Sequence, residues 1–204
     1  VTVDNTTMTV EQYIQNVLAG PGVVVSNVTL NGSPAAALIS NPQGGSFTDI
    51  NSHVGLANGV ILGSGNVAMA AQLNTSTSSS LGGTGNLGVD LDLASITSST
   101  IYDECIVEFD FVPAGDTLTF NYVFASEEYV TYVCGNVNDA FGFFLTGNNP
   151  LGGTYNAENI ALVPNPLSPG SYTNTPVSIN TVNPGVPGAA GTLTNCTSID
   201  PNFA

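Results

Sequence analysis

The sequence predicts an all-β fold, a jelly-roll-like β-sandwich with one short helix near the N-terminus. Short apolar or alternating segments recur along the chain and are separated by turn residues, among them 23 Gly and 12 Pro. Only one segment has the periodicity of an amphipathic helix. These features favour antiparallel sheets over a parallel sheet covered by helices. At 204 residues, such a chain is expected to form a single domain over residues 1–204.

The predicted helix follows Thr9. Thr9 and Gln12 have the spacing of a capping box, in which each side chain bonds the main chain of the other residue. Apolar residues then recur at positions 10, 13, 14, 17 and 18, and Gly20-Pro21-Gly22 ends the pattern. We expect an amphipathic helix of about three turns that covers an edge or a face of a sheet.

Strands are predicted on both sides of a long loop. β-branched residues fill 23–30, and Asn31-Gly32 is typical of a hairpin turn. The clearest alternation lies in 105–112, where Cys105, Val107, Phe109 and Phe111 face one side. Further strands are predicted over 35–40, 59–62, 118–124, 140–146, 159–163 and 177–182, a long loop rich in Ser, Thr and Gly over 73–88, and a Pro-rich surface excursion over 164–191.

The charge balance is extreme, because the chain has no Lys or Arg against 15 Asp and Glu, a formal net charge of -15. Average usage would supply about 25 basic residues in this length. An ion pair within the chain therefore requires His53, its single histidine. Since no cationic groove can form, we expect no nucleic acid and no anionic membrane among the partners.

Ten of the 15 acidic residues lie between Asp90 and Asp139. Glu127 and Glu128 are adjacent in an aromatic stretch, where carboxylates repel each other and lose solvation. No basic side chain can offset them, and Ca²⁺ binds carboxylate, amide and carbonyl oxygens. The sequence therefore predicts a Ca²⁺ site; the alternative is that these carboxylates are solvated loop ends. The predicted ligands are Glu127, Glu128, Asn138 and Asp139, with Asp90 and Asp92, expected on one side of an extended segment, as weaker candidates.

Catalysis has less support in the sequence. Neighbouring residues of a strand point to opposite faces, so Glu127 and Glu128 form a poor pair for glycoside hydrolysis. The chain has no Trp for stacking on a sugar. His53 has no nucleophile motif beside it. We therefore predict no catalytic residue and a non-enzymatic protein.

The three cysteines indicate an extracellular location. Cys134 and Cys196 both lie beside turn residues, and we predict a disulfide between them. Cys105 lies in an apolar run, where a buried thiol packs as a small hydrophobic residue. An odd count leaves open that this thiol is paired outside the segment.

Two motifs of the second half resemble the choice-of-anchor L domain family: Phe124-Ala-Ser-Glu-Glu-Tyr129 and Asn138-Asp-Ala-Phe-Gly-Phe-Phe144. The helix after Thr9 and residues 60–66 fit the opening half of that family. Residues 88–93 read Gly-Val-Asp-Leu-Asp-Leu where the family has Gly-Asp-Ala-Asp-Leu, so the resemblance supports Asp90 and Asp92 less. It implies a domain near the start of large secreted or surface-anchored proteins of gliding and adhesive bacteria that use type IX secretion. It also implies that the domain continues beyond residue 204.

Two functions follow from these observations. The first is a non-enzymatic extracellular module of a bacterial adhesin or filament, located at the cell surface and stabilised by Ca²⁺. Its expected partners are other surface or filament subunits, or an extracellular polysaccharide. The alternative is a secreted carbohydrate-binding or carbohydrate-active domain, based on the Asn, Tyr and carboxylate side chains.

Overall fold

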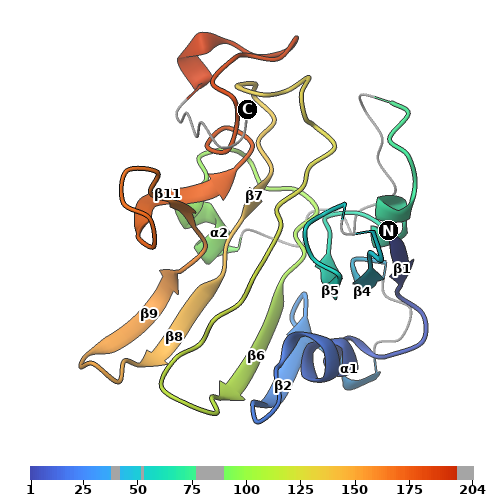
Figure 1. Cartoon of the computed structure of the whole chain (residues 1–204), viewed down its shortest axis with the longest axis vertical. Coiled ribbons are helices and arrows are strands. Elements are labelled where there is room, and N and C mark those ends of the chain that lie inside the picture. The colour runs from blue at the N-terminus through green and yellow to red at the C-terminus, as the bar shows by residue number, and fades with distance from the viewer. Residues whose placement is uncertain (38–41, 52, 77–89, 197–204) are drawn as a thin grey trace. The chain divides into compact units, whose positions relative to one another are not determined.

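A computed structural model describes residues 1–37, 42–51, 53–76 and 90–196 (Figure 1). The chain forms two compact units. Of the described residues, unit 1 contains those within 1–75 and 102–123, and unit 2 contains 76, 90–101 and 124–196. The strands form several small antiparallel sheets, which confirms the all-β class and is consistent with a sandwich.

Unit 1 contains two antiparallel sheets of three strands each. In the first sheet β4 lies between β1 and β5, and in the second sheet β2 lies between β3 and β6. The Asn31-Gly32 turn joins β2 to β3 with both residues at positive φ, which confirms the predicted hairpin. The strands are β1 (Thr2–Asp4), β2 (Val24–Leu30), β3 (Ser33–Pro34), β4 (Gly44–Thr48), β5 (Asn58–Leu62) and β6 (Val107–Val112).

The N-terminal helix of unit 1 begins as predicted. Thr9 Oγ1 accepts a hydrogen bond from Gln12 N at 3.2 Å, and Gln12 Oε1 accepts one from Thr9 N at 2.9 Å, so the capping box is confirmed. The helix α1 (Val10–Tyr13) continues as a π-helical turn over Ile14–Leu18. It contacts β2 and β4, one strand from each sheet (Figure 1).

The core of unit 1 joins this helix to both sheets. Its buried members are Val10, Ile14, Val28, Leu30 and Ala35. Partly buried side chains of β5 and β6, and the side chain of Cys105, pack against them. The burial of apolar side chains from three elements in one cluster supplies most of the stability of such a unit.

The alternation predicted for 105–112 is confirmed in β6. Val107, Phe109 and Phe111 are half-buried, and the residues between them are exposed. The two carboxylates on the exposed face accept hydrogen bonds from β2: Thr29 Oγ1 donates to Glu108 at 3.2 Å, and Asn27 Nδ2 donates to Asp110 at 2.7 Å. These acidic side chains of unit 1 are therefore satisfied by neutral donors.

Unit 2 consists of a three-stranded sheet, a hairpin and a short helix. In the sheet β11 lies between β10 and β7, and β8 pairs with β9 in the hairpin (Figure 1). The elements are α2 (Leu91–Ile96), β7 (Ala140–Phe141), β8 (Phe144–Asn148), β9 (Thr154–Asn159), β10 (Leu162–Pro164) and β11 (Tyr172–Ser178). Short 3-10 turns over Ala35–Ala37, Val67–Ala71 and Leu193–Asn195 complete the described helical structure.

Several predicted strands of the second half are corrected by the structure. Residues 118–124 form no strand, although Phe120, Tyr122 and Phe124 are more buried than their neighbours. The period of two decides which side chains are buried, but a strand also needs a backbone partner. The predicted strand 140–146 is broken at Gly142, where a Cβ would lie 2.4 Å from the ring of Phe144.

Other boundaries were also predicted wrongly. The strand placed at 177–182 ends at Ser178, because the main chain turns there, with Val182 N donating to Ser178 O. Residues 159–163 divide between the end of β9 and β10. The strand predicted for 35–40 begins instead as a 3-10 turn over Ala35–Ala37. Residues 38–40 and most of the predicted loop 73–88 lie outside the described residues.

The prediction of a single domain that continues beyond residue 204 stays a prediction. Within the described ranges no helix combines the length and the apolar character needed to cross a membrane.

Candidate functional site

The acidic residues predicted as Ca²⁺ ligands lie mainly on one loop of unit 2, residues 126–139. Ser126 Oγ donates a hydrogen bond to Asp139 Oδ2 at 2.7 Å and accepts one from Glu128 N at 3.0 Å. The Ser126 hydroxyl thus connects the two ends of the loop. Asp139 is held further by its main-chain oxygen, which accepts a hydrogen bond from Ile179 N at 3.1 Å.

Three carboxylates of this loop share one electrostatic environment. Burial raises the pKa of Glu128, and the negative charges of Glu127 and Asp139 raise it further. Burial also raises the pKa of Tyr129 to about 12, with a second contribution from the charge of Asp139. Glu127 and Asp139 therefore lie close enough to Glu128 for their charges to act on it.

Two carboxylate oxygens of the loop lack a partner. Oε2 of Glu127 and Oε2 of Glu128 are both buried, and neither has a hydrogen-bond partner. Buried polar atoms are normally satisfied, and leaving a charged one unpaired costs more than leaving a neutral one. No Lys or Arg exists in the chain to supply a partner.

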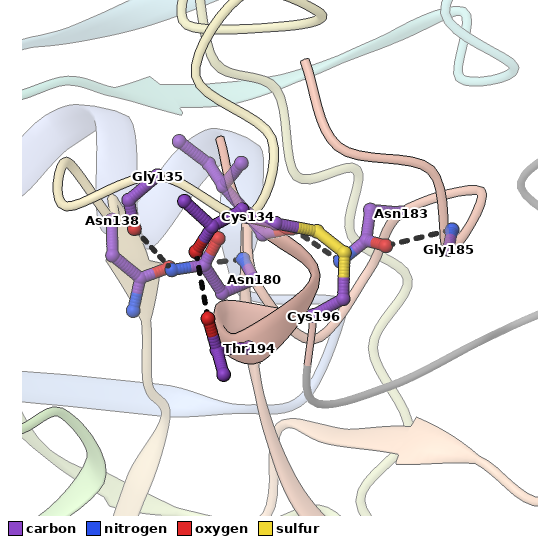
Figure 2. Close-up of a disulfide and its surroundings, with 10 residues drawn as sticks. Cys134, Gly135, Asn138, Asn180, Asn183, Gly185, Thr194 and Cys196 are labelled. Atoms are coloured by element: carbon purple, nitrogen blue, oxygen red, sulfur yellow. Dashed lines mark hydrogen bonds between the residues drawn. A yellow bond between two sulfur atoms is a disulfide. The ribbon is translucent and has the colours of Figure 1, made fainter. Parts of the chain in front are cut away.

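Asn138 serves as an anchor of the loop. Its Oδ1 accepts a hydrogen bond from Asn180 N at 3.0 Å, and Asn180 Nδ2 donates to Gly135 O at 3.1 Å (Figure 2). The two asparagines connect the acidic loop to the residues that follow β11. The amide oxygen that was predicted as a ligand is therefore already engaged in a hydrogen bond.

The expectation that Asp90 and Asp92 lie on one side of an extended segment is wrong. Asp90 is the N-cap of α2, and its Oδ1 accepts a hydrogen bond from Leu93 N at 2.7 Å. Asp92 lies in the first turn, where its negative charge interacts favourably with the positive end of the helix dipole. An Asp before a short apolar segment is the sequence signal of a helix start. Their role as metal ligands stays a prediction.

The predicted disulfide between Cys134 and Cys196 is confirmed (Figure 2). Cys134 is fully buried and packs with Val133 and Ile179 in the core of unit 2. The link fastens the segment 188–196 to the acidic loop, with a Cα–Cα distance of 4.7 Å between the two cysteines.

Main-chain hydrogen bonds continue this attachment. Gly188 N donates to Val133 O, Ala190 N to Thr131 O and Thr192 N to Cys134 O, each at 2.9 Å. A Cβ at Gly188 would lie 2.0 Å from Val130 O, so only glycine allows this close approach. The acidic loop is thus held at Ser126, at the disulfide and at Asn138.

No group of three or more His, Cys, Asp or Glu side chains within the described residues is arranged to hold a metal ion. A cation at the acidic loop would therefore need main-chain oxygens or water besides the carboxylates. Ser126 and Asn180, which order the loop, were not predicted from the sequence. Ser126 could have been found by its place beside the carboxylate pair, whereas no local pattern marks Asn180.

His53, the single histidine, contacts a buried carboxylate in unit 1. His53 Nδ1 lies 2.9 Å from Asp49 Oδ1, and Val54 N donates to Asp49 Oδ2 at 2.9 Å. The His53 side chain is 63% exposed and that of Asp49 is 1% exposed. His53 is therefore a polar surface residue that also satisfies a buried carboxylate.

The chain was compared with known proteins. The family model of the choice-of-anchor L domain matches residues 2–203. The chain belongs to this family. No curated protein and no solved structure matches it. A choice-of-anchor domain is a surface-associated module of a cell-surface or secreted protein, and the family is not a known enzyme family. The match includes the whole acidic loop.

Proposed function

We propose that this choice-of-anchor L domain is a non-enzymatic extracellular module of a bacterial adhesin or filament, and that Ca²⁺ bound at the carboxylates of Glu127 and Glu128, with main-chain oxygens and water completing the site, stabilises it. The observation that carries the proposal is the pair of buried Oε2 atoms of Glu127 and Glu128 without a hydrogen-bond partner. Membership of a surface-associated family supports the extracellular location.

The physical argument concerns the cost of the unpaired charges. A buried carboxylate oxygen without a hydrogen-bond partner is stabilised when a cation neutralises its charge. Ca²⁺ accepts six to eight oxygens, and the carboxylates can be completed by main-chain carbonyl groups and water. Sites of extracellular modules bind Ca²⁺ with a Kd of roughly 10⁻⁴ to 10⁻³ M. We expect an affinity in that range, because few of the ligands are charged side chains.

The location of the site explains what binding would do. The loop is already held by the disulfide and by Asn180, and a cation would remove the remaining repulsion between its carboxylates. A loop stiffened in this way offers a fixed surface to its proposed partners, other surface or filament subunits or an extracellular polysaccharide.

Thermal unfolding with excess EDTA and with excess CaCl₂ tests the proposal. Saturation at about 100 times the Kd should stabilise the folded state by about 2.7 kcal/mol, because Ca²⁺ binds only that state. The substitution Glu128→Gln should abolish the difference between the two conditions. Glu158→Gln, which removes an exposed carboxylate of β9 in the same unit, is the matched control and should keep it. Identical midpoints of the unsubstituted chain in EDTA and in CaCl₂ would contradict the proposal.

A further inference from the structure

We propose that Cys105 and Gln43 react to form an internal thioester that covalently joins the two sheets of unit 1. Gln43 directly precedes β4 of the first sheet, and Cys105 lies two residues before β6 of the second. The hydrogen bond from Cys105 Sγ to the main-chain oxygen of Gln43, at 3.4 Å, places the two residues in contact.

The carboxamide carbon of Gln43 is the electrophile, and its surroundings favour attack. Gln43 is completely buried. Asn31 Nδ2 donates a hydrogen bond to Gln43 Oε1 at 2.8 Å. A donor at this position polarises the carbonyl group and stabilises the negative charge that develops on its oxygen during attack. Asn31 is itself fixed, because its Oδ1 accepts a hydrogen bond from Ile106 N at 2.8 Å.

The carboxamide nitrogen of Gln43 is surrounded by more acceptors than it can use. Three main-chain oxygens lie within hydrogen-bond distance of Nε2, those of Ser64 at 3.0 Å, Asp103 at 3.3 Å and Glu104 at 3.2 Å. A carboxamide NH₂ group has two hydrogens to donate, whereas ammonia has three. The three acceptor oxygens therefore match the three N–H groups of ammonia, the leaving group of the reaction, better than the two N–H groups of the carboxamide.

The nucleophile and a proton carrier are adjacent in the chain. Burial raises the pKa of the Cys105 thiol to about 11, so the thiol must lose its proton as it attacks. Glu104 is 4% exposed, and both of its carboxylate oxygens are buried without a hydrogen-bond partner. A buried carboxylate without a hydrogen-bond partner can take the proton and pass it on.

The reaction balances without an added oxidant or reductant. The Cys105 Sγ–H bond breaks, a bond forms between Sγ and Cδ of Gln43, and the bond between Cδ and Nε2 breaks. The proton from sulfur passes through Glu104 to the leaving nitrogen, which departs as ammonia. Loss of ammonia to the medium draws the reaction forward, and the complete burial of Gln43 protects the thioester from water. The third cysteine then needs no disulfide partner.

Intact mass spectrometry of the unreduced chain tests this inference. We expect a mass lower by one ammonia than that of the chain with only the Cys134–Cys196 disulfide, and no reaction of Cys105 with iodoacetamide in denaturant. Methylamine in denaturant should open the bond, add one methylamine at Gln43 and release one thiol per chain. Because these measurements use the unsubstituted chain, they do not depend on the folding of a variant.

The variant Cys105→Ala is the control for other losses of ammonia. A succinimide at Asn31-Gly32 would lower the mass equally, but it would persist in Cys105→Ala, whereas the thioester cannot form there. Disappearance of the mass deficit in this variant supports the inference. An unchanged deficit in Cys105→Ala, or complete alkylation of Cys105 in an unsubstituted chain of full mass, overturns it.

Discussion

Asp49 of unit 1 and Glu128 of unit 2 show two different environments of a carboxylate in this chain. In unit 1 the hydrogen bond from Val54 N is the main cause that lowers the pKa of Asp49, and the contact with His53 lowers it further, against the opposing effect of burial. In unit 2 burial and two neighbouring carboxylates raise the pKa of Glu128, and no side chain of the described residues offsets them. In a chain without Lys or Arg, a buried carboxylate is stable where a main-chain N–H and the one histidine reach it.

The units also differ in what holds them together. Unit 1 has an apolar core that joins a helix to two sheets. The smaller buried cluster of unit 2 contains Cys134 and is tied to the segment 188–196 by the disulfide. We therefore expect unit 2 to depend on its covalent link and unit 1 to depend on packing.

The largest effect is expected from removing the disulfide. The substitution of both Cys134 and Cys196 by Ala opens a loop with a sequence separation of 62 residues. Loop entropy predicts a loss of about 4 kcal/mol in the free energy of unfolding at 25 °C. Equilibrium unfolding in urea measures it, and the unsubstituted chain with reductant should show the same loss. If the free energy of unfolding falls by less than about 1 kcal/mol, the disulfide is not a main source of the stability of unit 2.

A smaller loss in the free energy of unfolding is expected when a core side chain of unit 1 is truncated. Leu30 is 2% exposed in the cluster of α1 and β2, and Leu30→Ala should cost about 3 kcal/mol, because it leaves a cavity as well as losing apolar burial. Leu151→Ala, at a position 95% exposed, is the control and should cost less than about 0.5 kcal/mol. Equal losses for the two variants in urea unfolding would show that packing does not stabilise unit 1.

The smallest effects are expected from two substitutions of carboxylates, Asp49→Asn and Glu128→Gln. Their effects on the free energy of unfolding should depend on pH in opposite directions. A lowered pKa in the folded state means that Asp49 stabilises the fold above the unfolded value of about 3.9 and that this contribution is lost as the pH falls. Asp49→Asn should therefore be destabilising at neutral pH and have less effect in acid. The expected measurement is the urea midpoint of each variant between about pH 3 and pH 7.

Glu128 should behave in the opposite direction in the absence of Ca²⁺. Its raised pKa means that the fold pays a penalty once the pH rises past the unfolded value of about 4.3, and that none is present in acid. Glu128→Gln should remove that penalty and raise the free energy of unfolding at neutral pH by less than about 1 kcal/mol, since water partly screens the charges. A midpoint that falls in Glu128→Gln with EDTA present would show that the ionised carboxylate already has a partner.

Much of unit 1 could be predicted because its signals are local. The capping box at Thr9, the Asn31-Gly32 hairpin and the alternation in β6 each depend on residues close in sequence. The segment 118–124 shows the limit of this reasoning. Its alternation predicted the buried side of Phe120 and Tyr122, but a strand requires a backbone partner distant in the chain.

The acidic site was predictable in composition but not in arrangement. Clustered carboxylates without basic residues pointed to Glu127, Glu128, Asn138 and Asp139, and in the structure the charges of Glu127 and Asp139 act on Glu128. In the structure Asp90 caps a helix, and the side-chain oxygen of Asn138 accepts a hydrogen bond from Asn180 N. A local pattern cannot show which oxygen is already used by a donor 42 residues away.

The sequence by itself determined the all-β class, the family and the absence of any Lys or Arg partner for 15 carboxylates, because these follow from composition and local periodicity. Only the tertiary structure decided which carboxylates are satisfied. Asp49 receives Val54 N and His53, whereas Oε2 of Glu127 and of Glu128 receive no hydrogen bond. The physical reason is that burial and hydrogen bonding depend on contacts between distant segments, and the free energy of a charge depends on both.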